Sequence, residues 1–191
     1  QDSIKAKDTT AKKDIKKESN CLATINLVLN KRLSDEITTL NNTIEGTCIA
    51  RDLVNEPQSF LTAEQFSREM QAAGKKAGFN VEVFNKAKIK ALKMGGLLAV
   101  NLGSQLPPTF NVMEYKPKNA KNKNPYVLVG KGVVYDTGGL SLKPTANSMD
   151  YMKCDMGGGA AVVGTMYAIA KNKLPIYVVG LVPATDNRPG E

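Results

Sequence analysis

Two short apolar runs, and the segment between them, most constrain the fold of this chain. The runs are residues 126–129 and 176–182, and between them lie a glycine-rich stretch (130–157) and a helical segment of small residues (160–170). A strand, a loop, a helix and a second strand form a βαβ unit, whose strands pair in parallel. Because continuous apolar runs are typical of strands covered on both faces, we expect an α/β fold with a mostly parallel mixed sheet flanked by helices.

The segment before this unit predicts two helices and further short elements. Five apolar residues recur at three- and four-residue steps and form one helical stripe: Leu33, Ile37, Leu40, Ile44 and Cys48. Pro57 sets the latest end of this helix. Thr62 and Gln65 form a capping box that opens a second helix, which Gly78 ends. The remaining predicted elements are strands at 80–84, 97–102 and 110–115 and a short helix at 86–94.

The N-terminal segment differs from the rest of the chain in composition. Residues 1–20 are polar and repetitive in Lys, Asp and Thr, which is typical of a tail or linker. A short apolar patch at 25–29 predicts a strand. We therefore place a boundary near residue 30, with an α/β domain over residues 31–191.

Composition narrows the chemistry that this chain can perform. It contains no histidine, so the commonest general base and the commonest metal ligand are both excluded. Its three cysteines are scattered and odd in number, which gives no disulfide framework and favours a reducing, cytoplasmic setting. The apolar runs are too short to span a bilayer, so no membrane association is expected.

The net charge of +8 admits two interpretations, an anionic partner or a surface of solvated lysines. Much of the excess lies in residues 5–17 and 116–123, which lack interleaved aromatic residues. A basic balance alone is only the first sign of nucleic-acid binding, so a nucleic-acid partner is not favoured.

The residues with the most chemical potential lie in the loop system 130–155. Lys131, Asp136, Lys143 and Asp155 follow the carboxyl end of a predicted strand, where ligands bind in such sheets. Two carboxylates there can share a divalent cation, because oxygen ligands suit Mg and Mn and are accepted by Zn. The alternative is turn and cap chemistry, since Asp136 opens a DTGG turn and Asp155 precedes three glycines and a helix.

The two lysines and the glycines also leave alternatives open. A desolvated Lys131 would be a neutral amine and a possible metal ligand, whereas an exposed one would only reach solvent. Lys143 would stabilise a developing oxyanion, or lie in a surface turn. Residues 157–159 would cradle a phosphate or allow close packing of helix on sheet, and the alanines that follow favour packing.

Several ordered motifs resemble the leucyl aminopeptidase family, also called the cytosol aminopeptidase family. They are VGKGVVYDTGG, SLKP, SMDYMKCDMGGGAAV and LPIYVVGLVPATDNRPG, preceded by ARDLVNEPQSFLTAEQ. The resemblance covers residues 45–191, and residues 20–45 more weakly. It implies a metal-dependent aminopeptidase that releases apolar, Leu-like residues from the N-termini of peptides, using water activated by two divalent ions, Mn or Zn and possibly Mg. It also implies a cytoplasmic homo-oligomer, a hexamer in the family.

The resemblance assigns a role to five residues of this sequence. Lys131 and Asp155 would bind one metal, and Asp136 would contact both. Lys143 would polarise the peptide carbonyl as the catalytic lysine and contact the substrate. Met152 would line the pocket for the substrate's first side chain.

The resemblance also implies that the site is incomplete. Further family ligands, an Asp, a Glu and an Arg, come from an NTDAEGR segment that this sequence does not contain. We therefore expect residues 1–30 to be the end of a missing N-terminal domain and residues 31–191 the first part of the catalytic domain, inactive alone. The alternative function is a non-catalytic subunit with the same fold, which binds nucleic acid or pairs with active subunits.

Overall fold

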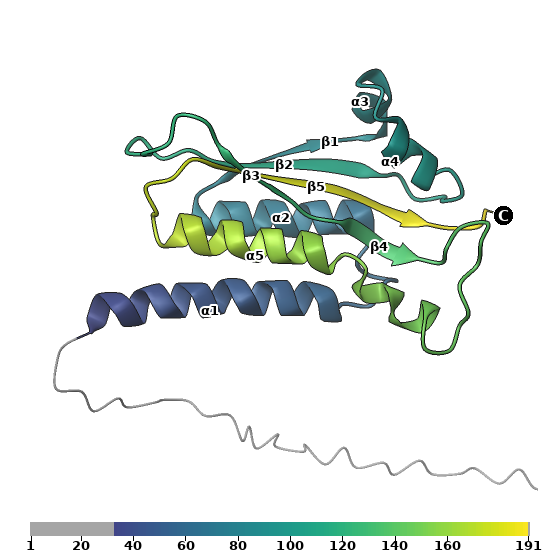
Figure 1. Ribbon diagram of the computed structural model, residues 1–191, viewed down its shortest axis with the longest axis horizontal. Coiled ribbons are helices and arrows are strands. Elements are labelled where there is room, and N and C mark those ends of the chain that lie inside the picture. Colours follow the sequence, from purple (N-terminus) through teal and green to yellow (C-terminus); the bar gives the residue numbers. More distant parts are fainter. Residues whose placement is uncertain (1–32, 191) are drawn as a thin grey trace, which may run out of the picture. The chain divides into compact units, whose positions relative to one another are not determined.

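The computed structural model describes residues 33–190 and shows helices packed against one face of a mixed sheet (Figure 1). Helices α2 and α5 lie directly on the sheet, and α1 packs against α5 on the side away from the sheet. The helices are α1 (Ser34–Asn55), α2 (Ala63–Ala77), α3 (Lys86–Ala91), α4 (Gly95–Val100), the 3-10 helix η1 (Met149–Cys154) and α5 (Gly157–Lys171). The strands are β1 (Asn80–Phe84), β2 (Thr109–Tyr115), β3 (Tyr126–Val129), β4 (Gly132–Asp136) and β5 (Val178–Asn187).

Strand β5 is the centre of the sheet. The order is β1-β2-β5-β3, and β4 also pairs with β5. The β1–β2 and β2–β5 pairings are antiparallel, whereas β3 and β4 run parallel to β5. The expected α/β fold with a mixed sheet and flanking helices is therefore confirmed, as is the parallel pairing of the two strands that bracket α5. The sheet is less parallel than expected, since two of the four pairings among the described residues are antiparallel.

The apolar stripe predicted for α1 does not face the core. Leu40 and Ile44 are 57% and 49% exposed and Cys48 is exposed, whereas the buried residues of α1 are Gly46 and Leu53.

The bounds of the two N-terminal helices follow their sequence signals. Helix α1 ends before Pro57, as predicted. At the start of α2 the Thr62 hydroxyl accepts a hydrogen bond from the Gln65 N–H, 3.1 Å away. Gly78 ends α2 with φ 93°, a left-handed conformation that costs glycine little.

The core lies between the sheet and helices α2 and α5. Its fully buried side chains include Phe66, Met70, Met113, Val163, Met166 and Val182. Each large apolar side chain buried in this way contributes about 1.5–3 kcal/mol to stability. This layer fixes the sheet against α5 and so determines where the loops at the carboxyl ends of the strands begin.

The burial predicted for the run 126–129 is wrong. In β3 the side chains of Val127 and Val129 are 52% and 71% exposed. Within residues 33–190, β3 pairs only with β5. The helices that pack on the sheet cover the face of β3 opposite to Val127 and Val129. Hydrophobic content alone therefore did not reveal on how many faces the strand is covered.

Two other predictions need correction. Residues 97–102 do not form a strand, because Gly95–Val100 is helix α4. A short apolar run without alternation fits both states, and its length could not decide between them. The stretch 130–157 is mostly loop, but it also contains β4 and η1, two elements that were not predicted. Strand β5 runs beyond residue 182 to Asn187, and this extension gives β4 its partner.

The predicted tail at 1–20, the strand at 25–29 and the boundary near residue 30 lie outside the described residues. Among the described helices, none combines the length and apolar character needed to cross a membrane.

Helices α1 and α5 cross at two glycines, and this generates a stability prediction. A Cβ at Gly46 would lie 2.5 Å from the Gly164 carbonyl oxygen. We expect Gly46→Ala to lower the free energy of unfolding by about 1–3 kcal/mol, as overpacking does, despite the helix propensity of alanine. Urea unfolding of both forms measures the difference.

The matched control is Gly96→Ala in α4, where no atom lies within 4 Å of the new Cβ. This change should be neutral or stabilising by about 0.4–1 kcal/mol. Equal stability of the two variants would contradict the close crossing of α1 and α5.

Candidate active site

The five predicted site residues lie on the β3–β4 link, at the end of β4 and in the segment that follows it. Lys131 lies in the link between β3 and β4, and Asp136 is the last residue of β4. Lys143 lies in the loop after β4, Met152 lies in η1, and Asp155 directly follows η1. Because η1 contacts β4, the segment after the strand folds back onto it.

Glycines set the position of Lys131. The Gly159 N–H donates a hydrogen bond of 2.7 Å to the Lys131 carbonyl oxygen. A Cβ at Gly130 would lie 2.6 Å from the Gly158 carbonyl oxygen, so only glycine fits at this approach. The packing interpretation of residues 157–159 is therefore confirmed, and this packing holds the start of α5 beside the β3–β4 link.

Asp136 is held by three donors. The Lys143 ammonium lies 2.7 Å from Oδ2, and the Gly138 N–H donates to Oδ1 over 2.9 Å. The Asn187 amide donates to the same Oδ1 over 2.8 Å. Burial acts most strongly on the pKa of Asp136 and raises it, but the three hydrogen bonds together outweigh burial and hold this pKa below its usual value. Asp136 is therefore an anion at neutral pH.

Asp155 forms the second ion pair, with Lys131. The Lys131 Nζ donates to Oδ1 over 2.9 Å and lies 2.8 Å from Oδ2. Oδ2 is nevertheless buried without a hydrogen bond among the described residues, because closeness to Nζ does not give it hydrogen-bond geometry. Its lone pairs would therefore be available to a cation that replaced the Lys131 ammonium. The Lys131 side chain is 56% exposed, so of the two alternatives left open for this lysine the exposed one holds.

Lys143 links the first ion pair to Met152. Its Nζ lies 3.5 Å from the Met152 Sδ as well as 2.7 Å from the Asp136 Oδ2. The structure thus joins Asp136, Lys143 and Met152 in one group and Lys131 with Asp155 in another. Residues Met152 and Asp155 connect the two groups through η1, where the Asp155 N–H donates to the Met152 carbonyl.

Asn187 is a site residue that the sequence reasoning missed. It lies within the motif LPIYVVGLVPATDNRPG but was given no role, yet it is the last residue of β5 and touches Asp136. The rule that ligands collect at the carboxyl ends of parallel strands, applied to the second strand as well as the first, would have found it.

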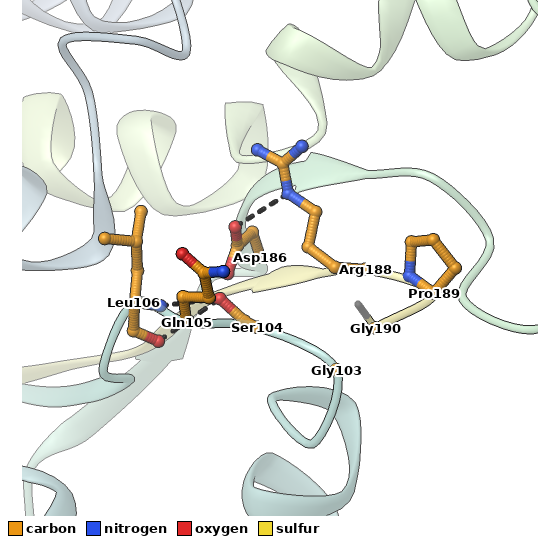
Figure 2. Close-up of a pocket in the computed structure, with 8 residues that line it drawn as sticks. All are labelled: Gly103, Ser104, Gln105, Leu106, Asp186, Arg188, Pro189 and Gly190. Atoms are coloured by element: carbon orange, nitrogen blue, oxygen red, sulfur yellow. Dashed lines mark hydrogen bonds and ion pairs between the residues drawn. The ribbon is translucent and has the colours of Figure 1, made fainter.

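A cavity of about 470 Å³ lies beside the end of β5 and is not lined by the residues of these pairs (Figure 2). Its wall includes the buried Asp186, which accepts a hydrogen bond of 2.9 Å from the Arg188 Nε. The segment Ser104–Leu106 also lines it. The cavity contains none of the five predicted residues, so we do not assign the chemistry to it.

The donor set fits a divalent cation in part. Asp136 and Asp155 supply carboxylate oxygens, one of them buried without a hydrogen bond, and Lys131 supplies an amine when deprotonated. Within residues 33–190 no three His, Cys, Asp or Glu side chains converge as a metal cluster. The described residues therefore offer fewer donors than two complete coordination spheres require.

Comparison with known proteins identifies the family. The profile of the cytosol aminopeptidase family, catalytic domain, matches residues 48–191. This chain belongs to the cytosol aminopeptidase family. The family motifs expected from the sequence are the segments that carry the two ion pairs described above.

Individual relatives agree with this membership. The chain is 55% identical over 141 residues to a probable cytosol aminopeptidase of Chloroherpeton thalassium, covering 74% of this chain and 27% of that protein. It is 47% identical over 182 residues to a probable cytosol aminopeptidase of Azoarcus sp., covering 93% and 36%. The chain thus spans about a third of the length of these members of the cytosol aminopeptidase family.

A solved structure has a similar fold. The bottromycin maturation enzyme BotP, in complex with Mn, superposes with a TM-score of 0.80 at 36% identity. The match covers 91% of this chain and 37% of that one. The fold of BotP is therefore shared across most of this chain.

Lys153 ties the site segment to helix α1. Its ammonium donates to the carbonyl oxygens of Val54 and Asn55, 3.0 and 3.2 Å away, in the last turn of α1. A cation is favourable there because these carbonyls form the negative end of the helix. The contact fixes η1 between Met152 and Asp155 against a rigid element.

We expect Lys153→Met to loosen η1 without unfolding the domain. Amide hydrogen exchange of residues 149–155 should become faster by about fivefold or more, since a hydrogen bond to a charged group contributes about 1.5–3 kcal/mol. Exchange in β5 should not change. Unaltered protection of η1 would show that Lys153 does not hold this segment.

Proposed function

We propose that this chain forms part of a metal-dependent aminopeptidase that removes apolar, Leu-like N-terminal residues from peptides. The observation that carries the proposal is the Asp136–Lys143 ion pair at the end of β4, next to Met152, in a member of the cytosol aminopeptidase family. Divalent ions, when bound, would supply the Lewis acid that activates water. Asp136, Asp155 and Lys131 are the residues that would hold them.

The surroundings of Lys143 support the role of a carbonyl-polarising group. It lies between an anionic carboxylate and a methionine sulfur, which suits a pocket for an apolar side chain. A substrate whose first side chain contacts Met152 would present its carbonyl to the Lys143 ammonium. A fixed positive charge there stabilises the negative charge that develops on the carbonyl oxygen. Lys143 would then exchange its partner, from Asp136 to the substrate.

The direct test is hydrolysis of a leucyl chromogenic amide by the full-length protein. The proposal expects hydrolysis that depends on added Mn²⁺ and is abolished by a chelator. We propose two divalent ions, with Mn, Zn or Mg as the metals to compare, and BotP in complex with Mn supports beginning with manganese. Release of leucine without added metal, after chelation and dialysis, would contradict the proposal.

The remaining parts of the proposal concern assembly and compartment. We propose a cytoplasmic homo-hexamer, on the family resemblance and the names of the relatives. Light scattering of the full-length protein distinguishes a hexamer from a monomer. Residues 31–191 are proposed as the first part of the catalytic domain.

Asp136→Asn is expected to weaken Mn²⁺ binding more than about 100-fold. Removing a group that merely hydrogen-bonds to a metal ligand costs about 10–100-fold, and Asp136 is the proposed ligand itself. Isothermal titration with Mn²⁺ measures the change. The matched control is Asp150→Asn, an exposed carboxylate on η1 that accepts hydrogen bonds only from backbone N–H groups. Equal Mn²⁺ affinity of the two variants would contradict the assignment of Asp136 as a metal ligand.

Lys143→Ala is expected to reduce turnover and leave Mn²⁺ binding unchanged. Turnover of the leucyl amide should fall by about 10²–10³-fold, as when an oxyanion-stabilising donor is removed, while bound Mn²⁺ is retained. Lys118→Ala, in an exposed loop, is the control for loss of a positive charge. If Lys143→Ala releases the metal, the lysine has a ligand-holding role and the proposed carbonyl contact is wrong.

A further inference from the structure

The two oxygens of the Asp136 carboxylate have different partners. Oδ1 accepts hydrogen bonds from the Gly138 N–H and the Asn187 amide, 2.9 and 2.8 Å away. Oδ2 lies 2.7 Å from the Lys143 ammonium. A carboxylate oxygen offers about two lone-pair sites, so both sites of Oδ1 are used by the fold. Only Oδ2 is left to a positive charge.

We propose that Asn187 is a positioning residue that fixes the rotation of the Asp136 carboxylate, so that Oδ2 faces the cation. This inference rests on the proposed function, because it concerns the same site. It adds a residue to which no role has been assigned, and it states which carboxylate oxygen is held by the fold.

Asn187 is itself held on both sides. Its backbone carbonyl accepts hydrogen bonds from the Thr137 N–H and hydroxyl, at 3.0 and 2.8 Å. It is the register partner of Asp136 in the β4–β5 pairing. A Cβ on Gly139 would lie 2.9 Å from the Asn187 Oδ1, so a glycine is needed where the turn passes the amide. The amide therefore has little freedom to move.

The hydrogen-bond chemistry fixes which way the amide faces. An ionised carboxylate oxygen only accepts, so the NH₂ group of Asn187 must point to Asp136. The strand holds this donor in place whether Lys143 contacts Asp136 or a substrate. Lys143 can then change partners without the carboxylate rotating, which is what an exchanging lysine requires.

The test uses Asn187→Ala and Asn187→Leu in the full-length protein, since leucine keeps the size of the side chain and lacks the donor. We expect both to bind Mn²⁺ about 10–100-fold more weakly in an EPR titration, because groups that orient metal ligands contribute this much. With Mn²⁺ saturating, kcat for a leucyl amide should fall while KM changes less than threefold. The control is Asn80→Ala, an exposed residue at the start of β1, which should match the unaltered protein.

The outcomes separate this inference from the function on which it rests. Wild-type Mn²⁺ affinity in both variants, with hydrolysis intact, overturns the positioning role and leaves the aminopeptidase proposal standing. A lower melting temperature with unchanged Mn²⁺ affinity assigns Asn187 to stability alone and also overturns it. If the unaltered protein neither binds Mn²⁺ nor hydrolyses the amide, the proposed function fails and this inference fails with it.

Discussion

The structure depends on the pairing of β5 along its whole length. Antiparallel β2 lies on one side of it, and parallel β3 and β4 lie on the other. Only because β5 continues to Asn187 does β4 have a partner, and only because β4 forms does Asp136 stand at a fixed strand end. Helix α5 closes this arrangement from one face, where Gly159 donates to the Lys131 carbonyl. Backbone hydrogen bonds therefore fix the positions of both Asp136 and Lys131.

The site contains equal numbers of acidic and basic side chains. Each carboxylate is matched by one lysine, Asp136 by Lys143 and Asp155 by Lys131. Partly exposed ion pairs contribute little to stability, so stability gives no strong reason to gather them at one end of the sheet. The pairs instead place each carboxylate beside a lysine that can change partner. This is the arrangement expected of residues that exchange a lysine for a metal ion or a substrate.

The sequence predicted most of the fold where local signals were strong. The Thr62 cap, the Gly78 end and the helix before Pro57 follow from short-range chemistry, and each was confirmed. Burial of β3, the helix at Gly95–Val100 and strand β4 depend on which distant segments lie beside them, so periodicity could not give them. The motif residues were predicted, but the Asn187–Asp136 contact spans 51 positions and appears only when two strands pair.

The most direct test of the central claim is an anomalous difference map of the full-length protein with Mn²⁺, recorded at the manganese edge. The claim predicts manganese peaks at the carboxylates of Asp136 and Asp155, with the Lys131 amine turned toward one of them and Lys143 released from Asp136. Manganese bound elsewhere, with both lysine–aspartate ion pairs intact, would contradict it.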